Sequence, residues 1–132
     1  MSKTTITKEV IVTCPNKTGT LGKVTTTLAE GKVNIDACCC YTMDGNTCNF
    51  HLVTTDTGKT TDLCKKGGWT CKENTVVCCE LNNKVGALAE TTTKLAQAGV
   101  DIEYCYVSTG NGSTTRAYFC TKDNNKACKT LG

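Results

Sequence analysis

The residues with the clearest capacity for chemistry are twelve cysteines and a single histidine. Cys38 and Cys40 stand in a run of three cysteines, shortly before an Asp44-Gly45 pair. Asp-Gly favours a two-residue hairpin turn. Such a turn pairs residues whose numbers sum to 89, so Cys38 would face His51, with Cys40 on the same face of the sheet. Two sulfurs and an imidazole on one face suit a soft metal ion.

Other features of the sequence argue against a metal site. No C-x-x-C pair is present, and the positions 67 residues further on hold Cys105, Val107 and Tyr118. Cysteine also packs as a small apolar side chain. We therefore predict reduced thiols with no metal ion and no other cofactor, and we keep a thiol- or metal-binding protein that uses Cys38, Cys40 and His51 as an alternative.

Catalysis and nucleic-acid binding have little support in the sequence. Only one histidine is present to act as a base near neutral pH, carboxylates such as Glu90 and Glu103 occur singly, and no phosphate-binding loop is found. The formal net charge is +3, and Arg116 is the only arginine, so no phosphate-binding stripe forms. We predict no catalysis and no nucleic-acid partner.

Signals for a membrane or for secretion are also missing. No stretch approaches the roughly 20 apolar residues of a membrane helix. Residues 1–9 lack the apolar core of a secretory signal. We predict a cytoplasmic protein without a membrane partner.

An internal repeat organises the 132 residues. Shifting the sequence by 67 positions aligns its two halves without a gap, from Val10 on Val77 to Lys59 on Lys126. Self-similarity at a fixed period indicates two copies of one structural unit. We place these copies at residues 1–73 and 74–132. Further matching pairs are Asn16 with Asn83, Gly19 with Gly86, Leu21 with Leu88, Leu28 with Leu95, and Ile35 with Ile102.

Each copy has the pattern of a β-α-β-β-α-β unit. Residues 10–14 alternate as a strand does, and apolar residues at helical spacing follow over 21–28. Two strands on either side of an Asp-Gly or Asn-Gly turn come next. Residues 59–66 then predict a helix, ended by Gly67-Gly68, before a short strand at 69–72. The predicted fold class is α+β, with two tandem ferredoxin-like units whose helices cover one face of an antiparallel sheet.

The second copy stops before the last strand of this pattern. Its final helix would occupy residues 126–131, with no counterpart of the strand at 69–72. One side of the strand at 76–81 would then be open, and open edges attract other strands. We expect a neighbouring chain to cover this edge with an edge strand or with its own residues 3–7, giving a homodimer or a larger, filament-forming assembly. A structural protein that assembles in this way without a ligand is a second alternative function.

Two phrases, each present in both copies, resemble the ACT domain, a small regulatory fold that binds amino acids. The first phrase is NKTGTL at 16–21 and NKVGAL at 83–88, and the second is LAEGKVNI at 28–35 and LAQAGVDI at 95–102. The resemblance covers nearly the whole chain as a tandem pair. It implies a non-catalytic regulatory sensor that responds to a small-molecule amino acid.

The sequence departs from the family pattern before the first helix in both copies, and at the end of that helix in the first copy. The family has a proline before the glycine, and this proline would make the loop more rigid. Thr18 and Val85 stand at that position here. Gly31-Lys32 aligns with Ala98-Gly99, so the first copy puts a lysine where the helix end favours a left-handed residue.

The strand–helix loops are the predicted ligand sites. Gly19 and Gly86 allow a small molecule to approach the backbone where a helix begins, and the unpaired N–H groups there suit a carboxylate. Asn16 and Asn83 are placed to hold polar groups. The resemblance adds Asn34 and Asp101, whose family positions contact the ligand, with Asp101 suited to an ammonium group. The predicted ligand-binding residues are Asn16, Lys17, Gly19, Thr20, Leu21, Asn34, Ile35, Asn83, Lys84, Gly86, Ala87, Leu88, Asp101 and Ile102.

Overall fold

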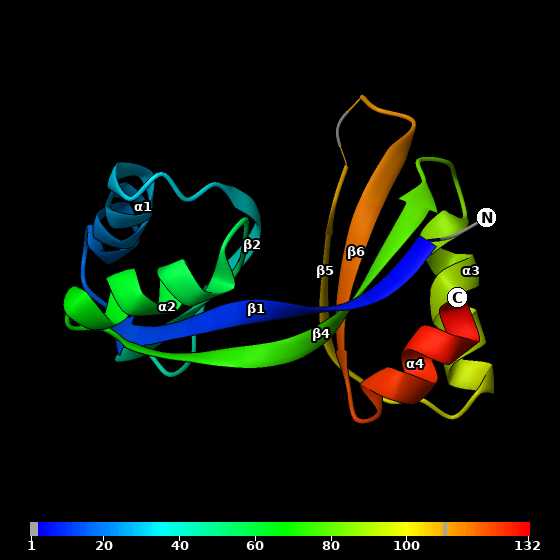
Figure 1. Ribbon diagram of the computed structural model, residues 1–132. Helices are drawn as coiled ribbons and strands as arrows, with labels where there is room; N and C mark the ends of the chain where they lie inside the picture. Colours follow the sequence, from blue (N-terminus) through cyan, green and yellow to red (C-terminus); the bar gives the residue numbers. More distant parts are fainter. Residues whose placement is uncertain (1–2, 110) are drawn as a thin grey trace. The chain divides into compact units, whose positions relative to one another are not determined.

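The computed structural model describes residues 3–109 and 111–132 and has the predicted α+β fold (Figure 1). None of the helices in these residues has the length and the apolar character needed to cross a membrane. The elements follow one another as β1 (Lys3–Pro15), α1 (Thr20–Glu30), β2 (Ile35–Thr42), β3 (Thr47–Thr54), α2 (Thr57–Lys66), β4 (Thr70–Asn82), α3 (Ala87–Gln97), β5 (Ile102–Ser108), β6 (Thr114–Thr121) and α4 (Asn124–Leu131).

Strands β1 and β4 are longer than the sequence pattern predicts, and each contributes to two compact units. β4 joins the two strands predicted at 69–72 and 76–81 into one. The first repeat unit is Lys8–Asn74. The second repeat unit is Thr75–Gly132 together with the N-terminal segment that ends at Thr7. The boundaries 1–73 and 74–132 follow the repeat in sequence, whereas the N-terminal segment packs with the second repeat unit.

In the first repeat unit, α1 and α2 cover one face of the sheet. β3 pairs antiparallel with β1 on one side and with β2 on the other. Alternate side chains of β1 and β3 face the helices, and burying them with the apolar faces of both helices holds the unit together. The buried core consists of Val10, Val12, Cys14, Val24, Leu28, Val33, Cys48, Phe50, Leu52 and Cys64.

The hairpin between β2 and β3 has a three-residue loop, so the predicted two-residue turn is wrong. The N–H of Met43 donates to the carbonyl oxygen of Thr47 at 2.8 Å, which closes the loop one residue later than Asp44-Gly45 would. Oδ1 of Asp44 accepts from the N–H groups of Asn46 and Thr47, each at 3.0 Å. Gly45 has a φ of 87°, a left-handed conformation that glycine adopts without strain.

The longer loop changes which side chains share a face. Cys39 faces His51, and Cys38 faces Leu52. Leu52 belongs to the core beneath the helices, so His51, the preceding residue, points to the opposite face of the sheet. Cys40 packs against the same core. The alternative of a metal site formed by Cys38, Cys40 and His51 is therefore geometrically excluded, because the two cysteines and the histidine lie on opposite faces.

In the second repeat unit, β4 has a neighbour on each side, so the predicted open edge is wrong. β4 has β1 on one side and β6 on the other. The hydroxyl of Thr4 in β1 donates to Sγ of Cys79 in β4 at 3.5 Å, and Sγ of Cys128 in α4 donates to the carbonyl of Thr4 at 3.9 Å. The chain's own N-terminal segment therefore lies beside β4, where we had expected a neighbouring chain (Figure 1).

The core of the second repeat unit repeats the pattern of the first. α3 and α4 pack on the face of the sheet formed by β4 and β6. The pairing of β4 with β6 is antiparallel and sets Val77 opposite Phe119. Buried core residues are Val77, Cys79, Leu81, Leu95, Val100, Ala117, Phe119, Ala127 and Leu131.

The ends of α1 and α3 show the difference that the sequence predicts. Lys32 has a φ of 62° and is the only non-glycine residue with a positive φ in residues 3–109 and 111–132. Its counterpart Gly99 has a φ of 74°. The first copy therefore places a lysine in the left-handed conformation that glycine takes in the second.

Candidate ligand-binding site

The loops that precede α1 and α3 have the same backbone conformation in both copies. Gly19 has a φ of 88° and Gly86 a φ of 90°, and each is the N-cap of its helix without a side-chain cap. A Cβ atom at either position would meet no atom within 4 Å. The glycines are therefore required for their backbone conformation, and the space in front of them is open.

Asn16 and Asn83 attach these loops to the neighbouring hairpins. The N–H of Asn16 donates to the carbonyl of Asn46 at 2.8 Å, and its Nδ2 donates to that of Gly45 at 3.3 Å. In the second copy, the N–H of Asn83 donates to Ser113 at 2.9 Å, and its Nδ2 donates to Gly112 at 2.9 Å. Both asparagines thus fix the loop to the hairpin through their amide nitrogens.

A surface pocket of about 340 Å³ lies at the start of α1. It brings together one group of the predicted ligand-binding residues, namely Asn16, Lys17, Gly19, Thr20 and Leu21. Gly22 and residues of β2 and β3 complete the lining: Cys40, Tyr41, Thr42, Cys48 and Phe50. The sequence patterns marked these last residues as strand positions and did not connect them with the loop. In a β-α-β-β unit, the loop between β1 and α1 lies next to the hairpin between β2 and β3. This feature of the topology would have identified the strand residues that line the pocket.

The charge distribution of this pocket favours an anionic group. The first-turn N–H groups of a helix have no partners within the helix and carry a partial positive charge. Lys17 adds a full positive charge, and no acidic side chain is among the residues that line the pocket. Phe50 and Cys48 provide an apolar floor, and both are buried. A small molecule with a carboxylate and an apolar part fits this arrangement.

Asn34 and Ile35 lie away from this pocket. Ile35 pairs with Thr54 at one end of β3, whereas Thr42 pairs with Cys48 at the other. The 8 residues of β2 separate these ends by roughly 25 Å. Ile35 packs against the core, and Nδ2 of Asn34 donates to Asp36 at 2.9 Å. One small molecule bound within the first repeat unit therefore contacts the loop set or the Asn34 set, not both.

The second copy has a more polar pocket of about 310 Å³ between α3 and the end of α4, which is not the counterpart of the first pocket, because Asn83, Gly86 and Leu88 do not line it. Lys84 and Ala87 are the predicted ligand-binding residues that line it. Asp101 is exposed elsewhere, with Oδ2 3.8 Å from Nζ of Lys122, and Ile102 packs against the core. The lining residues are Leu81, Asn82, Lys84, Ala87, Glu90, Thr91, Lys94, Leu131 and Gly132.

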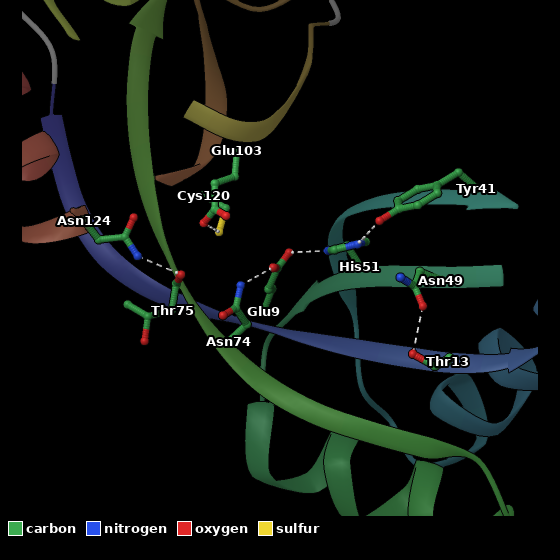
Figure 2. A network of polar contacts seen from close by, with 10 residues as sticks. All are labelled: Glu9, Thr13, Tyr41, Asn49, His51, Asn74, Thr75, Glu103, Cys120 and Asn124. Atoms are coloured by element: carbon green, nitrogen blue, oxygen red, sulfur yellow. Dashed lines mark hydrogen bonds and ion pairs between the residues drawn. The ribbon is translucent and has the colours of Figure 1, made fainter. Parts of the chain in front are cut away.

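A second group of polar residues, which the sequence patterns did not connect, lies on the sheet face of the first repeat unit opposite its helices (Figure 2). Nδ1 of His51 lies 3.1 Å from Oε1 of Glu9, and Nδ2 of Asn74 donates to Oε2 of Glu9 at 2.9 Å. Nε2 of His51 lies 3.0 Å from the phenolic oxygen of Tyr41, whose ring stacks on the imidazole. The histidine that suggested a metal ligand is therefore held in a hydrogen-bonded network.

Fold, repeat and glycine loops together define a tandem regulatory domain of the ACT class. The model of the ACT domain pair family matches residues 4–131, and the chain belongs to this family. ACT domains are regulatory modules. A comparison with curated proteins finds no match.

Solved structures show the same fold. Protein BT0572 from Bacteroides thetaiotaomicron is 25% identical, with a TM-score of 0.89 over 97% of this chain and 88% of that one. The regulatory subunit of aspartate kinase from Thermus thermophilus, in its ligand-free form, is 11% identical, with a TM-score of 0.67 over 97% and 93% of the two chains. The same subunit from Thermus flavus is 15% identical, with a TM-score of 0.66 over 98% and 94%.

Proposed function

We propose that this ACT domain pair is a non-catalytic sensor that binds an amino acid at its glycine-containing strand–helix loops. The observation that carries the proposal is the pocket at the start of α1, which gathers the predicted loop residues around a helix N-terminus. The ligand's carboxylate lies at the first-turn N–H groups of α1, with Lys17 nearby. Its side chain packs on Phe50 and Cys48, and hydroxyl or carbonyl groups of the loop and β2 accept from its ammonium group.

The second loop offers a different set of charges for the same class of ligand. Lys84 and Lys94 are available to a carboxylate, and Glu90 to an ammonium group. We propose that the two copies differ in ligand preference, because their pockets are lined by different elements, and the first is more apolar and the second more polar. We also propose that a ligand held by another copy of the chain contacts the remaining predicted residues, which are Asn34, Ile35, Asp101 and Ile102.

Self-association is also part of the proposal. Among the residues that the structure describes, β2 is an end strand of the first repeat unit and β5 an end strand of the second, so each has a side available for another chain. A homodimer through β5 would leave the pocket beside α1 in place, whereas one through β2 would add a strand next to Cys40, Tyr41 and Thr42, which line that pocket. Light scattering at micromolar concentration measures the mass of the assembly. A mass of 14.1 kDa would contradict self-association but not the sensor proposal.

Thermal-shift measurements and calorimetry with the twenty amino acids test the sensor proposal. A ligand at one hundred times its dissociation constant should stabilise the protein by about 2.7 kcal/mol. The amide of the active amino acid lacks the carboxylate and should have no effect. Lys17→Gln should weaken binding at the first loop, with Lys84→Gln as the matched change at the second. If no amino acid alters the melting temperature, the proposal is wrong.

A further inference from the structure

Two buried thiols face each other at the floor of the pocket beside α1. Cys14, near the end of β1, is the register partner of Cys48, at the start of β3. Their Sγ atoms lie 3.6 Å apart, and the residues are 3% and 6% exposed. A disulfide requires an S–S distance of about 2.05 Å. The sulfurs therefore need to approach by only a small rotation of two side chains that already face each other.

Cys48 also gives this thiol pair a route to small molecules. It lines the pocket of about 340 Å³, whereas Cys14 lies behind it in the core. Its Sγ contacts the carbonyl oxygens of Cys14 at 3.6 Å and Pro15 at 3.9 Å. A peroxide in the pocket would meet Cys48 first and would find Cys14 next to it.

We propose that Cys14 and Cys48 are a redox-modification site, which a hydroperoxide converts into a reversible disulfide at the floor of the pocket. In the first step, the Cys48 thiolate attacks one oxygen of hydrogen peroxide, the O–O bond breaks, and a sulfenic acid and hydroxide form. The sulfur of Cys14 then attacks the Cys48 sulfur and displaces water. Overall, two thiols and one hydrogen peroxide give one disulfide and two waters. A dithiol reductant reverses the reaction.

The order of these steps follows from the surroundings of the two sulfurs. Burial raises the pKa of the Cys14 thiol to about 11, with further contributions from Cys48. Cys14 therefore stays protonated near neutral pH and suits the resolving step, in which its proton leaves with the displaced water. Cys48 is the member of the pair that lines the pocket, so we assign the first attack to it.

The second copy provides an internal comparison. The residues that correspond to Cys14 and Cys48 are Leu81 and Thr115, which are register partners in the same way. The thiol pair is therefore a property of the first loop pocket, and oxidation would act on one pocket of the two. Joining β1 to β3 at this place would fix the strands that carry the pocket floor.

Peptide mapping of the oxidised protein tests the proposal directly. The protein is treated with hydrogen peroxide, its remaining thiols are blocked with N-ethylmaleimide, and it is cut after lysine and before aspartate. Cys14 is then the only cysteine in the peptide at 9–17, and Cys48 the only one in the peptide at 44–55. We expect these two peptides to be linked. In oxidised protein that has not been blocked, the thiol count should fall from twelve to ten, and dithiothreitol should restore twelve.

Variants separate this reaction from oxidation at the surface. A background with Cys38→Ser and Cys105→Ser removes two exposed thiols that compete for peroxide. In that background, Cys14→Ala should abolish the link, and Cys64→Ala, which removes another buried thiol, should leave it unchanged. The proposal is overturned if the link joins other peptides, or if the Cys14–Cys48 pair stays reduced at peroxide levels that oxidise Cys38 in the wild-type chain. These readouts do not depend on any amino-acid ligand.

Discussion

Nδ1 of His51 lies 3.1 Å from a carboxylate oxygen of Glu9, and the two residues are 2% and 0% exposed. A carboxylate only accepts hydrogen bonds, so Nδ1 of His51 donates to Glu9. Nε2 of His51 lies 3.0 Å from the phenolic oxygen of Tyr41. Asn74 donates to the second carboxylate oxygen. The hydrogen-bond donors around Glu9 thus offset the free-energy cost of burying its carboxylate.

His51→Ala should destabilise the first repeat unit strongly, because it removes a donor from the buried Glu9. Breaking a buried pair from one side costs about 3–5 kcal/mol. Tyr41→Phe removes the hydrogen bond between the phenol and Nε2 of His51 but leaves Nδ1 facing Glu9, so it should cost only about 1–2 kcal/mol. Urea unfolding of both variants measures these losses, and a Tyr41→Phe loss as large as that of His51→Ala would contradict the assignment of Glu9 as the critical group.

Lys32→Gly should stabilise the protein. A non-glycine residue in the left-handed region costs about 1–2 kcal/mol, and the greater freedom of glycine in the unfolded chain returns part of this gain. We expect a net increase of about 0.5–1 kcal/mol in the free energy of unfolding. The matched change, Gly99→Lys, should lower it by a similar amount, and equal effects of the same sign would refute the argument.

The same substitution should have opposite effects at two glycines of the first loop pocket. Gly19 has a φ of 88°, so Gly19→Ala should destabilise by about 1–2 kcal/mol through backbone strain alone. Gly22 lies within α1 with open space around it, so Gly22→Ala should stabilise by about 0.5–1 kcal/mol. Chemical denaturation of the two variants measures the difference, and a destabilising Gly22→Ala would mean that this end of α1 is not helical in solution.

Stability should fall at alkaline pH because buried thiols resist ionisation. Burial raises the pKa of Cys64 from 9.0 to about 11, so the unfolded chain loses this proton at a lower pH than the folded one. Between pH 9 and 11, a single thiol of this kind lowers the free energy of unfolding by about 1.4 kcal/mol per pH unit. Cys64→Ala should reduce the slope by that amount. Val24→Ala, a buried truncation without an ionisable group, should keep the wild-type slope.

Deleting residues 1–7 should expose one side of β4 in the second repeat unit. The deletion removes Thr4, which contacts Cys79 and Cys128. We expect greater association in light scattering than for the full chain, because an unpaired apolar strand attracts others. Adding a peptide of residues 1–9 should reverse the effect. An unchanged mass and melting temperature would mean that the N-terminal segment does not stabilise the second repeat unit.

Local signals predicted much of the fold. The 67-residue repeat, the alternation of residues 10–14 and the glycines at the helix ends identified the β-α-β-β-α-β pattern, and the Gly31-Lys32 shift identified the strained end of α1. The turn at Asp44-Gly45 was predicted one residue too short, because Asp44 also caps the N–H groups of Asn46 and Thr47. The one extra residue in the loop shifts the register of the hairpin, so His51 lies on the opposite face of the sheet from Cys38.

The site was predicted only in part, because its wall comes from distant segments. The loop residues Asn16 to Leu21 carry a recognisable pattern, whereas Cys48 and Phe50 are ordinary strand residues until the hairpin folds against the loop. The place of the N-terminal segment beside β4 was missed for a similar reason. Strand alternation identifies a buried face but not the strand that pairs at an edge.

The position of β1 has a consequence for synthesis on the ribosome. Thr4 contacts Cys79, 75 residues later, and Cys128, 124 residues later. Residues 3–7 therefore lack their complete docking surface until the chain has emerged as far as Cys128, whereas residues 10–15 of the same strand pair with residues 47–52 much earlier. Contacts of such long sequence separation form slowly. Residues 3–7 are therefore expected to acquire protection from hydrogen exchange in a nascent chain later than residues 8–15 of the same strand.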